Sequence, residues 1–310
     1  MLDKRMGKVV LIIGNGFDLD LGLKTAYSHF ATTGVPEWEK WLSVELYKPK
    51  SIYNEKIIGN SLGLYLKLAR EKENWFDVEE LIYNYVNENR SPRDSLIGLV
   101  RNQYDNFKIS FQEYLTRVAR EDNVSKQSLA WNLFRKSVKT KDYSVISFNY
   151  TDCYALCQCE RPHNRAFYQV HGTQDGEIVL GCRDYLEKKV NNKFQFMYKP
   201  EHAILQKDII VQRMKEATEV IIFGHSLNKM DFYYFVDYFK SKENVANKNH
   251  LTIICKDAES ENVIRRNIES CVGHSATIDN ADVIHTALFY MNNQQELRVY
   301  NELIERINIG

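Results

Sequence analysis

The sequence predicts an α/β protein with an open, mainly parallel sheet and a large all-helical insertion. Five short apolar runs have the length and the Val, Ile and Phe content of buried strands, and each ends in glycine or polar residues. These runs are residues 8–13, 143–148, 167–170, 219–223 and 251–255. Between the first two runs, residues 33–140 show helical spacing of apolar side chains and no clear strand.

Composition excludes several classes of protein. The 310 residues include 41 basic and 41 acidic side chains, so no net charge favours nucleic acid or an anionic membrane. No apolar run approaches the roughly 20 residues of a membrane span. The 6 cysteines show no paired Cys-x-x-Cys spacing. We therefore expect a reduced, cytoplasmic protein that binds neither nucleic acid nor membranes.

The expected domain organisation follows from this pattern. Residues 1–32 and 141–310 are expected to form a nucleotide-binding α/β domain, and residues 33–140 a helical insertion or cap. Within the insertion, helices are predicted from Pro36 to Leu46, around Leu62–Leu68 and from Asn74 to Tyr85. The last part of the chain, residues 281–308, is predicted to be a closing helix.

The first strand leads directly into a glycine turn. Lys8-Val9-Val10-Leu11-Ile12-Ile13 is followed by Gly14-Asn15-Gly16-Phe17-Asp18. Glycines at this point leave room for a phosphate near the backbone amides, and a following helix would direct its positive end there. The turn lacks the third glycine of the dinucleotide fingerprint, so a plain β-turn is the alternative.

Polar residues also follow the other strands. Parallel strands end at one edge of a sheet, so Asp18, Asn149, His171, Ser226 and Asp257 are expected to converge there. An Asn149 amide can position water or a sugar hydroxyl, or simply cap the next helix. A histidine at a strand end, such as His171, can accept a proton from water or a ribose hydroxyl near neutral pH.

Two local patterns are partly typical of other chemistries, a serine hydrolase and a zinc site. Gly224-His225-Ser226-Leu227-Asn228 nearly matches the Gly-x-Ser-x-Gly elbow of serine hydrolases, with Asp257 and His285 following in the order of a triad. Asn228 replaces the second glycine, which disfavours that strained turn. Cys153, Cys157, Cys159 and His163 lie close in sequence but lack the spacing of a zinc site, so no metal is expected.

A set of short segments occurs in one order along the chain: Gly14–Asp18, Gly22–Tyr27, Trp75–Glu79, Ser147–Thr151, Val170–Gly172 and Gly224–Leu227 followed by Asp231. Together these segments resemble the AbiH family of bacterial abortive-infection proteins, which act in phage defence. The resemblance extends from residue 8 to about residue 260. One departure is Leu21, where members of that family often carry histidine.

The same order of motifs is also remotely similar to sirtuins. Gly14-Asn15-Gly16 corresponds to their glycine turn, Asn149 to the Asn of their Gln-Asn-x-Asp motif, and His171-Gly172 to their catalytic His-Gly. The zinc module of sirtuins is absent from this sequence. The resemblance implies a sirtuin-like, Rossmann-like fold and hydrolysis of NAD, with NAD as substrate, rather than deacylation.

On this basis Asn149 and His171 are predicted to be catalytic, with Glu79 closing the pocket. The partners expected are NAD or a related nucleotide, and either a second copy of the chain or a regulatory protein of a defence system. The alternatives are a nucleotide-binding sensor without turnover and a serine hydrolase that uses Ser226. The residues expected to hold the nucleotide are Gly14, Asn15, Gly16, Phe17, Asp18, Gly224, His225, Ser226, Asp231 and Asp257.

Overall fold

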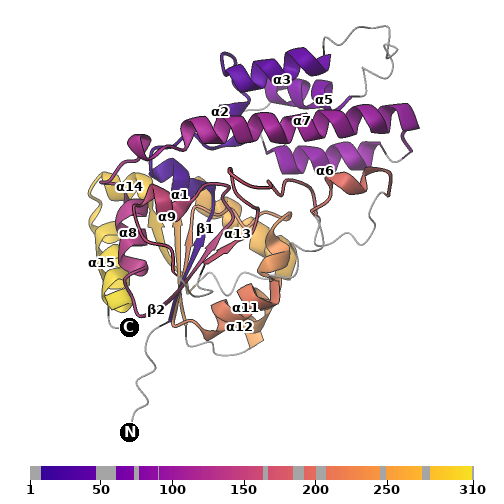
Figure 1. The fold of residues 1–310 in the computed structure, drawn as a ribbon. Coiled ribbons are helices and arrows are strands. Elements are labelled where there is room, and N and C mark those ends of the chain that lie inside the picture. The colour runs from indigo at the N-terminus through magenta and orange to yellow at the C-terminus, as the bar shows by residue number, and fades with distance from the viewer. Residues whose placement is uncertain are drawn as a thin grey trace.

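The centre of the protein is a β-sheet flanked by helices (Figure 1). The sheet has six strands, all parallel, in the order β3-β2-β1-β4-β5-β6. This is the strand order of Rossmann sheets, and the predicted open parallel α/β sheet is confirmed. The computed structural model describes residues 8–46, 61–72, 77–89, 91–162, 167–183, 192–199, 207–244, 249–273 and 280–308. The strands are β1 (Lys8–Ile13), β2 (Asp142–Ser147), β3 (Phe167–Gln169), β4 (Glu219–Phe223), β5 (His250–Cys255) and β6 (Asp282–His285).

The central strand β1 shows why the five predicted runs become strands. It pairs with β2 on one side and β4 on the other, and Val9 to Ile13 are at most 2% exposed. Val9, Leu11 and Ile13 pack into the core on one face, while Val10 and Ile12 pack into the core on the opposite face. A strand that is buried on both faces needs apolar residues at every position, which is the pattern in the sequence.

The sixth strand corrects the prediction that residues 281–308 form only helix. Asp282–His285 pairs in parallel with β5 at the edge of the sheet, and only Ile284 is fully buried. Helices begin after it, at Thr286 and Gln294. A four-residue edge strand with one buried side chain carries too little periodicity to be separated from the amphipathic helix that follows.

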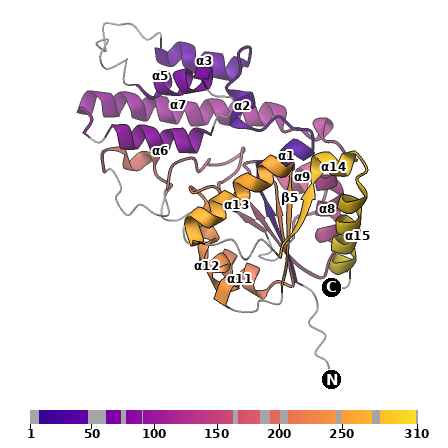
Figure 2. The same cartoon turned by 180° about the vertical axis from the view of Figure 1, so that it is seen from behind.

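Helices cover both faces of the sheet (Figure 2). One face packs against α1 (Asn15–Asp20), α8 (Leu129–Ser137), α9 (Cys153–Leu156) and α15 (Gln294–Asn308), with α14 (Thr286–Tyr290) beside them. The other packs against α11 (Lys207–Glu216), α12 (Val236–Asn244) and α13 (Ala258–Val272). The short 3-10 helices are η1 (Glu121–Asn123), η2 (Asn192–Met197) and η3 (Phe232–Tyr234).

A layer of helices from between β1 and β2 lies over the edge where the strands end (Figure 1). Its own aromatic core includes Phe30, Trp41, Phe107 and Phe111. The predicted helices at Pro36 and Leu62 are confirmed; Trp75 and Phe76 lie outside the described residues. Helix α8 packs on β1 instead of joining this layer. The helices of the layer are α2 (Tyr27–Phe30), α3 (Pro36–Leu46), α5 (Leu62–Lys72), α6 (Val78–Glu88) and α7 (Asp94–Val118).

The turns after β1 and β4 touch backbone to backbone. Gly16 N–H donates to the carbonyl of Gly224 at 2.9 Å, and Gly14 N–H donates to the carbonyl of Phe223 at 2.9 Å. A Cβ atom on Gly224 would lie 2.4 Å from Gly16 Cα, and Gly224 has a φ of 64°. The glycines are therefore required by the close approach of these two turns, in addition to any ligand.

At the other end of the sheet, Arg306 of α15 ties three strands together. Its guanidinium donates to Glu219 of β4 at 2.7 Å and to Asp282 of β6 at 2.9 Å. It also donates to the hydroxyl of Thr252 in β5 at 3.1 Å. Because Glu219 is only 2% exposed, it needs this partner.

We expect Gly224→Ala to destabilise the protein by about 2 kcal/mol or more, because it combines an overlap with the Gly16 backbone and a left-handed φ. The matched control is Gly98→Ala in α7, where an added Cβ meets nothing within 4 Å. That change should stabilise the helix by roughly 0.5–1 kcal/mol. Urea unfolding curves measure both values, and equal midpoints for the two variants would contradict the backbone-contact argument.

Candidate active site

Polar side chains gather in two buried clusters where the strands end. The first, the Asp18 cluster, consists of Asp18, Asn149 and Thr151. The second, the Lys199 cluster, consists of Lys199, Glu79, Asp231, His171 and His225. Each of these side chains is at most 6% exposed, and the residues come from the segments after β1 to β4 and from α6.

The Asp18 cluster joins the turns after β1 and β2. Asp18 lies in the first turn of α1, and its Oδ1 accepts from Asn149 Nδ2 at 2.8 Å while its Oδ2 accepts from the Thr151 hydroxyl at 2.8 Å. Burial raises the pKa of Asp18 to about 6, against the opposing effect of the bonds from Thr151 and Asn149. Asp18 therefore fixes the orientation of the Asn149 amide. Asn149 does not cap the next helix, α9, because the N-cap of that helix is Asp152.

The centre of the Lys199 cluster is a buried ammonium group. Lys199 Nζ lies 2.6 Å from Asp231 Oδ1, 2.9 Å from Glu79 Oε2 and 3.2 Å from His171 Nε2. The two carboxylates raise the pKa of Lys199 above its ordinary value despite burial, so the amine stays protonated. The ion pair with Glu79 connects the helical insertion to the loops of the sheet.

The Lys199 ammonium group is shared by two carboxylates, Asp231 and Glu79, whose pKa values shift in opposite directions. Lys199 and His171 lower the pKa of Asp231, overcoming its burial, and Asp231 is ionised. Burial and the charge of Asp231 raise the pKa of Glu79, although Lys199 opposes this shift. The Oε1 atom of Glu79 is buried and accepts no hydrogen bond within the described part of the chain. Glu79 is therefore the less compensated of the two acids.

Both histidines of the cluster face Asp231. His171 Nε2 lies 3.0 Å from Asp231 Oδ1, and its ring lies between Phe148 and Tyr150, with centroids 5.4 and 6.0 Å away. His225 Nδ1 accepts from the Leu227 amide at 2.9 Å, which leaves the ring proton on Nε2, 3.7 Å from Asp231 Oδ2. Burial lowers the pKa of His225 to about 4, so this ring is neutral at pH 7.

The residues of the first glycine turn mainly form hydrogen bonds and packing contacts within the protein. The amides of Gly14, Gly16 and Phe17 are bonded within the protein. The Phe17 ring is fully buried against Phe134 and Phe223. Asn15 is half-buried, and its Oδ1 accepts from the Thr25 hydroxyl at 2.7 Å. Of this turn, only Asp18 reaches one of the two clusters.

Ser226, Asp257 and His285 make their hydrogen bonds, as far as the structure describes them, outside the two clusters. Ser226 is half-buried, and its carbonyl accepts from Asn267 at 2.9 Å. Asp257 caps α13 by accepting from the Ser260 amide at 2.9 Å. His285 contacts Glu261 at 2.9 Å and Glu296 at 3.3 Å, at the far edge of the sheet.

The structure also bears on metals, surface hollows and membranes. No group of three or more His, Cys, Asp or Glu in the described ranges has the geometry to hold a metal; His163 lies outside them.

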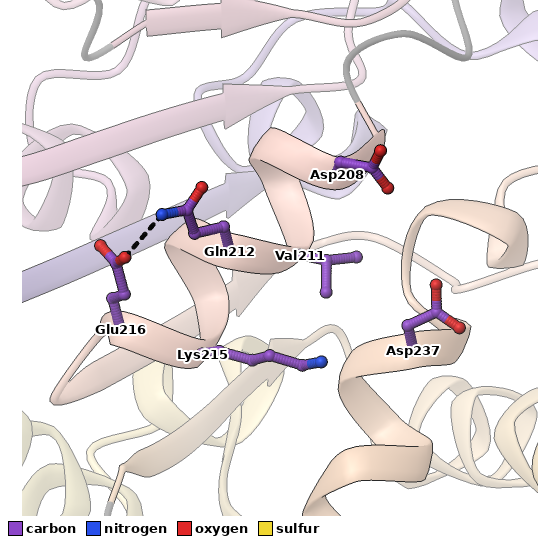
Figure 3. A pocket seen from close by; sticks show the side chains of 6 residues that line it. All are labelled: Asp208, Val211, Gln212, Lys215, Glu216 and Asp237. Atoms are coloured by element: carbon purple, nitrogen blue, oxygen red, sulfur yellow. Dashed lines mark hydrogen bonds between the residues drawn. The ribbon is translucent and has the colours of Figure 1, made fainter.

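A surface hollow lies between α11 and α12, lined by residues that include Lys215 and Asp237 (Figure 3). It is remote from both clusters, because Glu216 beside it contacts Lys8 at the start of β1. None of the described helices is both long and apolar enough to cross a membrane.

Sequence reasoning missed two members of the clusters. Lys199 stands in the stretch Met197-Tyr198-Lys199-Pro200, which carries no motif, and a lone lysine is ordinarily exposed. Thr151 ends the segment Ser147–Thr151, in which the sequence predicts a role for Asn149 alone. Both positions depend on how the loops fold over the sheet. The only signal in the sequence was the proximity of Thr151 to Asn149.

Fold and clusters together define an all-parallel α/β protein with a helical insertion that contributes a buried carboxylate at the edge where the strands end. Residues 10–253 match the family model described as "Bacteriophage abortive infection AbiH". The chain belongs to the AbiH family, and membership implies a role in phage abortive infection. No curated protein matches the sequence.

We expect Asp18→Asn to change how stability depends on pH. Folding raises the pKa of Asp18 from 3.8 to about 6, so the native state retains the proton longer and the free energy of unfolding falls as pH rises through this window. Between pH 4.5 and pH 7 the parent should lose about 2 kcal/mol relative to Asp18→Asn. Denaturant unfolding at several pH values measures this difference; parallel pH curves would show that Asp18 titrates normally.

Proposed function

We propose that this AbiH protein acts in abortive infection by binding NAD and hydrolysing the bond between nicotinamide and ribose. The observation that carries the proposal is the His171–Asp231 pair, with Nε2 and Oδ1 3.0 Å apart, at the carboxyl edge of a Rossmann-ordered sheet. Open α/β sheets bind their ligands at this edge. The distant likeness to sirtuins supports the choice of NAD among nucleotides.

The proposed reaction uses the two clusters in different ways. The C1′–N bond breaks with its electron pair remaining on the nicotinamide nitrogen, which thereby loses its positive charge. A water oxygen bonds to C1′, and the proton released goes to His171, whose charged form Asp231 stabilises. Asn149 positions the water or a ribose hydroxyl, because Asp18 already fixes the plane of its amide.

Burial of the clusters adds a requirement to this proposal. His171 is 4% exposed and Asn149 is 6% exposed, so a dinucleotide enters only after the surrounding segments separate. The helical insertion covers this edge (Figure 1) and contributes Glu79 to the Lys199 cluster. Movement of α6 relative to the sheet would open the site. A dry, closed site also protects a reactive ribosyl cation from side reactions.

The serine-hydrolase alternative receives less support from the geometry. A nucleophile elbow joins a strand directly to a helix, whereas β4 is followed by an extended loop and then η3. In this loop φ is positive at Gly224, 64°, and at Leu227, 51°, but not at Ser226, and His285 is held by Glu261 and Glu296. A nucleotide sensor without turnover remains the second candidate, since the same clusters can bind a nucleotide without cleaving it.

The decisive variant for the proposal is His171→Ala. Loss of a general base should lower the rate of nicotinamide release by about 10²–10⁴-fold. The Lys199–Asp231 ion pair at 2.6 Å remains, so the fold should be largely retained. The measurements are nicotinamide release over time and thermal melting with and without NAD. A parental rate in this variant would remove His171 from the mechanism, and NAD-induced stabilisation of a parent that releases no nicotinamide would favour the sensor.

Labelling of Ser226 separates the hydrolase from the proposed enzyme. A fluorophosphonate probe should leave Ser226 unlabelled, because no base contacts it in the described structure. Ser226→Ala should raise KM for NAD more than it lowers kcat, as expected for a ligand contact. Intact-protein mass spectrometry and steady-state kinetics measure the two effects. Labelling that disappears in Ser226→Ala would establish the hydrolase instead.

A further inference from the structure

The two carboxylate oxygens of Glu79 have different surroundings. Oε2 accepts from Lys199 Nζ at 2.9 Å, whereas Oε1 is buried and has no hydrogen-bond partner among the described residues. Glu79 as a whole is 4% exposed. A buried carboxylate oxygen without a partner is costly, and it is a position that a bound ligand would satisfy.

Local structure holds Glu79 in this place. It lies in the first turn of α6, and the helix begins at Asp77, whose side chain accepts from the amides of Glu79 and Glu80 at 3.0 and 3.2 Å. Lys199 then fixes the carboxylate and also contacts His171 Nε2 at 3.2 Å. A single ammonium group therefore sets the position of Glu79 relative to the proposed base.

The distribution of contacts around Lys199 leaves Glu79 as the less compensated of the two carboxylates. Lys199 lies closer to Asp231, at 2.6 Å, and His171 also contacts that carboxylate. We infer that Glu79 is a catalytic carboxylate, contributed by the helical insertion, that stabilises the positive charge developing on the ribose as nicotinamide leaves. This inference rests on the proposed NAD hydrolysis and adds a residue to it.

The step is balanced without any further reactant. As the C1′–N bond breaks, its electron pair neutralises the pyridinium nitrogen, and the positive charge passes to C1′ and the ring oxygen of the ribose. Glu79 Oε1 faces that charge, as acidic residues do in glycoside hydrolysis, until water bonds to C1′ and gives its proton to His171. Glu79 acts in its ionised form, so the rate should rise with pH as this carboxyl loses its proton.

The test compares Glu79→Gln with Glu80→Gln. Both residues lie in the same turn of α6, but Glu80 is exposed and its side chain pairs with Lys229, at 3.4 Å, across the surface. Glu79→Gln should lower kcat for NAD about 10²-fold or more with little change in KM, because the interaction forms in the transition state. Glu80→Gln should stay within about twofold of the parent.

Each outcome has a defined meaning. If the parent releases nicotinamide and a folded Glu79→Gln releases it at the same rate, this inference fails while the proposed function stands. If the parent releases none, the proposed function fails and the inference with it. Should Glu79→Gln melt early, both rates are measured at a temperature at which circular dichroism shows the variant to be folded. A rate lowered about 10²-fold there would support the inference, and a parental rate would overturn it.

Discussion

The packing of the helical insertion on the sheet depends on the ion pairs of the buried Lys199 ammonium group. This group contacts Glu79 of the helical insertion together with Asp231 and His171 of the loops above the sheet. Removing such a cation would leave two buried carboxylates with a single positive partner between them at most, which is costly. The insertion and the sheet are therefore joined through the same atoms that surround the proposed catalytic base.

This arrangement suggests how an abortive-infection protein can be held inactive. The Lys199 cluster is buried and, apart from Glu79 Oε1, is paired within the described part of the chain, so a ligand reaches it only when the segments above the sheet move. Under the proposed function, ligand entry would replace internal ion pairs, and its equilibrium would therefore depend on anything that shifts α6 relative to the sheet. Coupling of this kind requires no second site within the chain; it requires only that the closed and open arrangements differ in their contacts.

Much of the fold could be predicted from the sequence, because strands buried on both faces leave uninterrupted apolar runs such as residues 8–13 and 219–223. The polar ends of those strands predicted that Asp18, Asn149 and His171 converge; in the structure Asn149 contacts Asp18, whereas His171 contacts Asp231 in the other cluster. Lys199 could not be predicted, since its burial depends on loop packing rather than periodicity. The glycines were predicted for a phosphate, yet Gly14, Gly16 and Gly224 are explained by close contact between two turns, which a sequence alone cannot distinguish.

The part of the chain beyond the family match completes the sheet and stabilises it. The match ends at residue 253, but β6 pairs with β5 and Arg306 is the cation for the buried Glu219. A fragment cut at the end of the match would truncate β5, expose the backbone of its remaining part to intermolecular pairing and leave the Glu219 carboxylate without Arg306. The unit that folds is therefore larger than the unit that the family defines, and fragments for expression should retain α15.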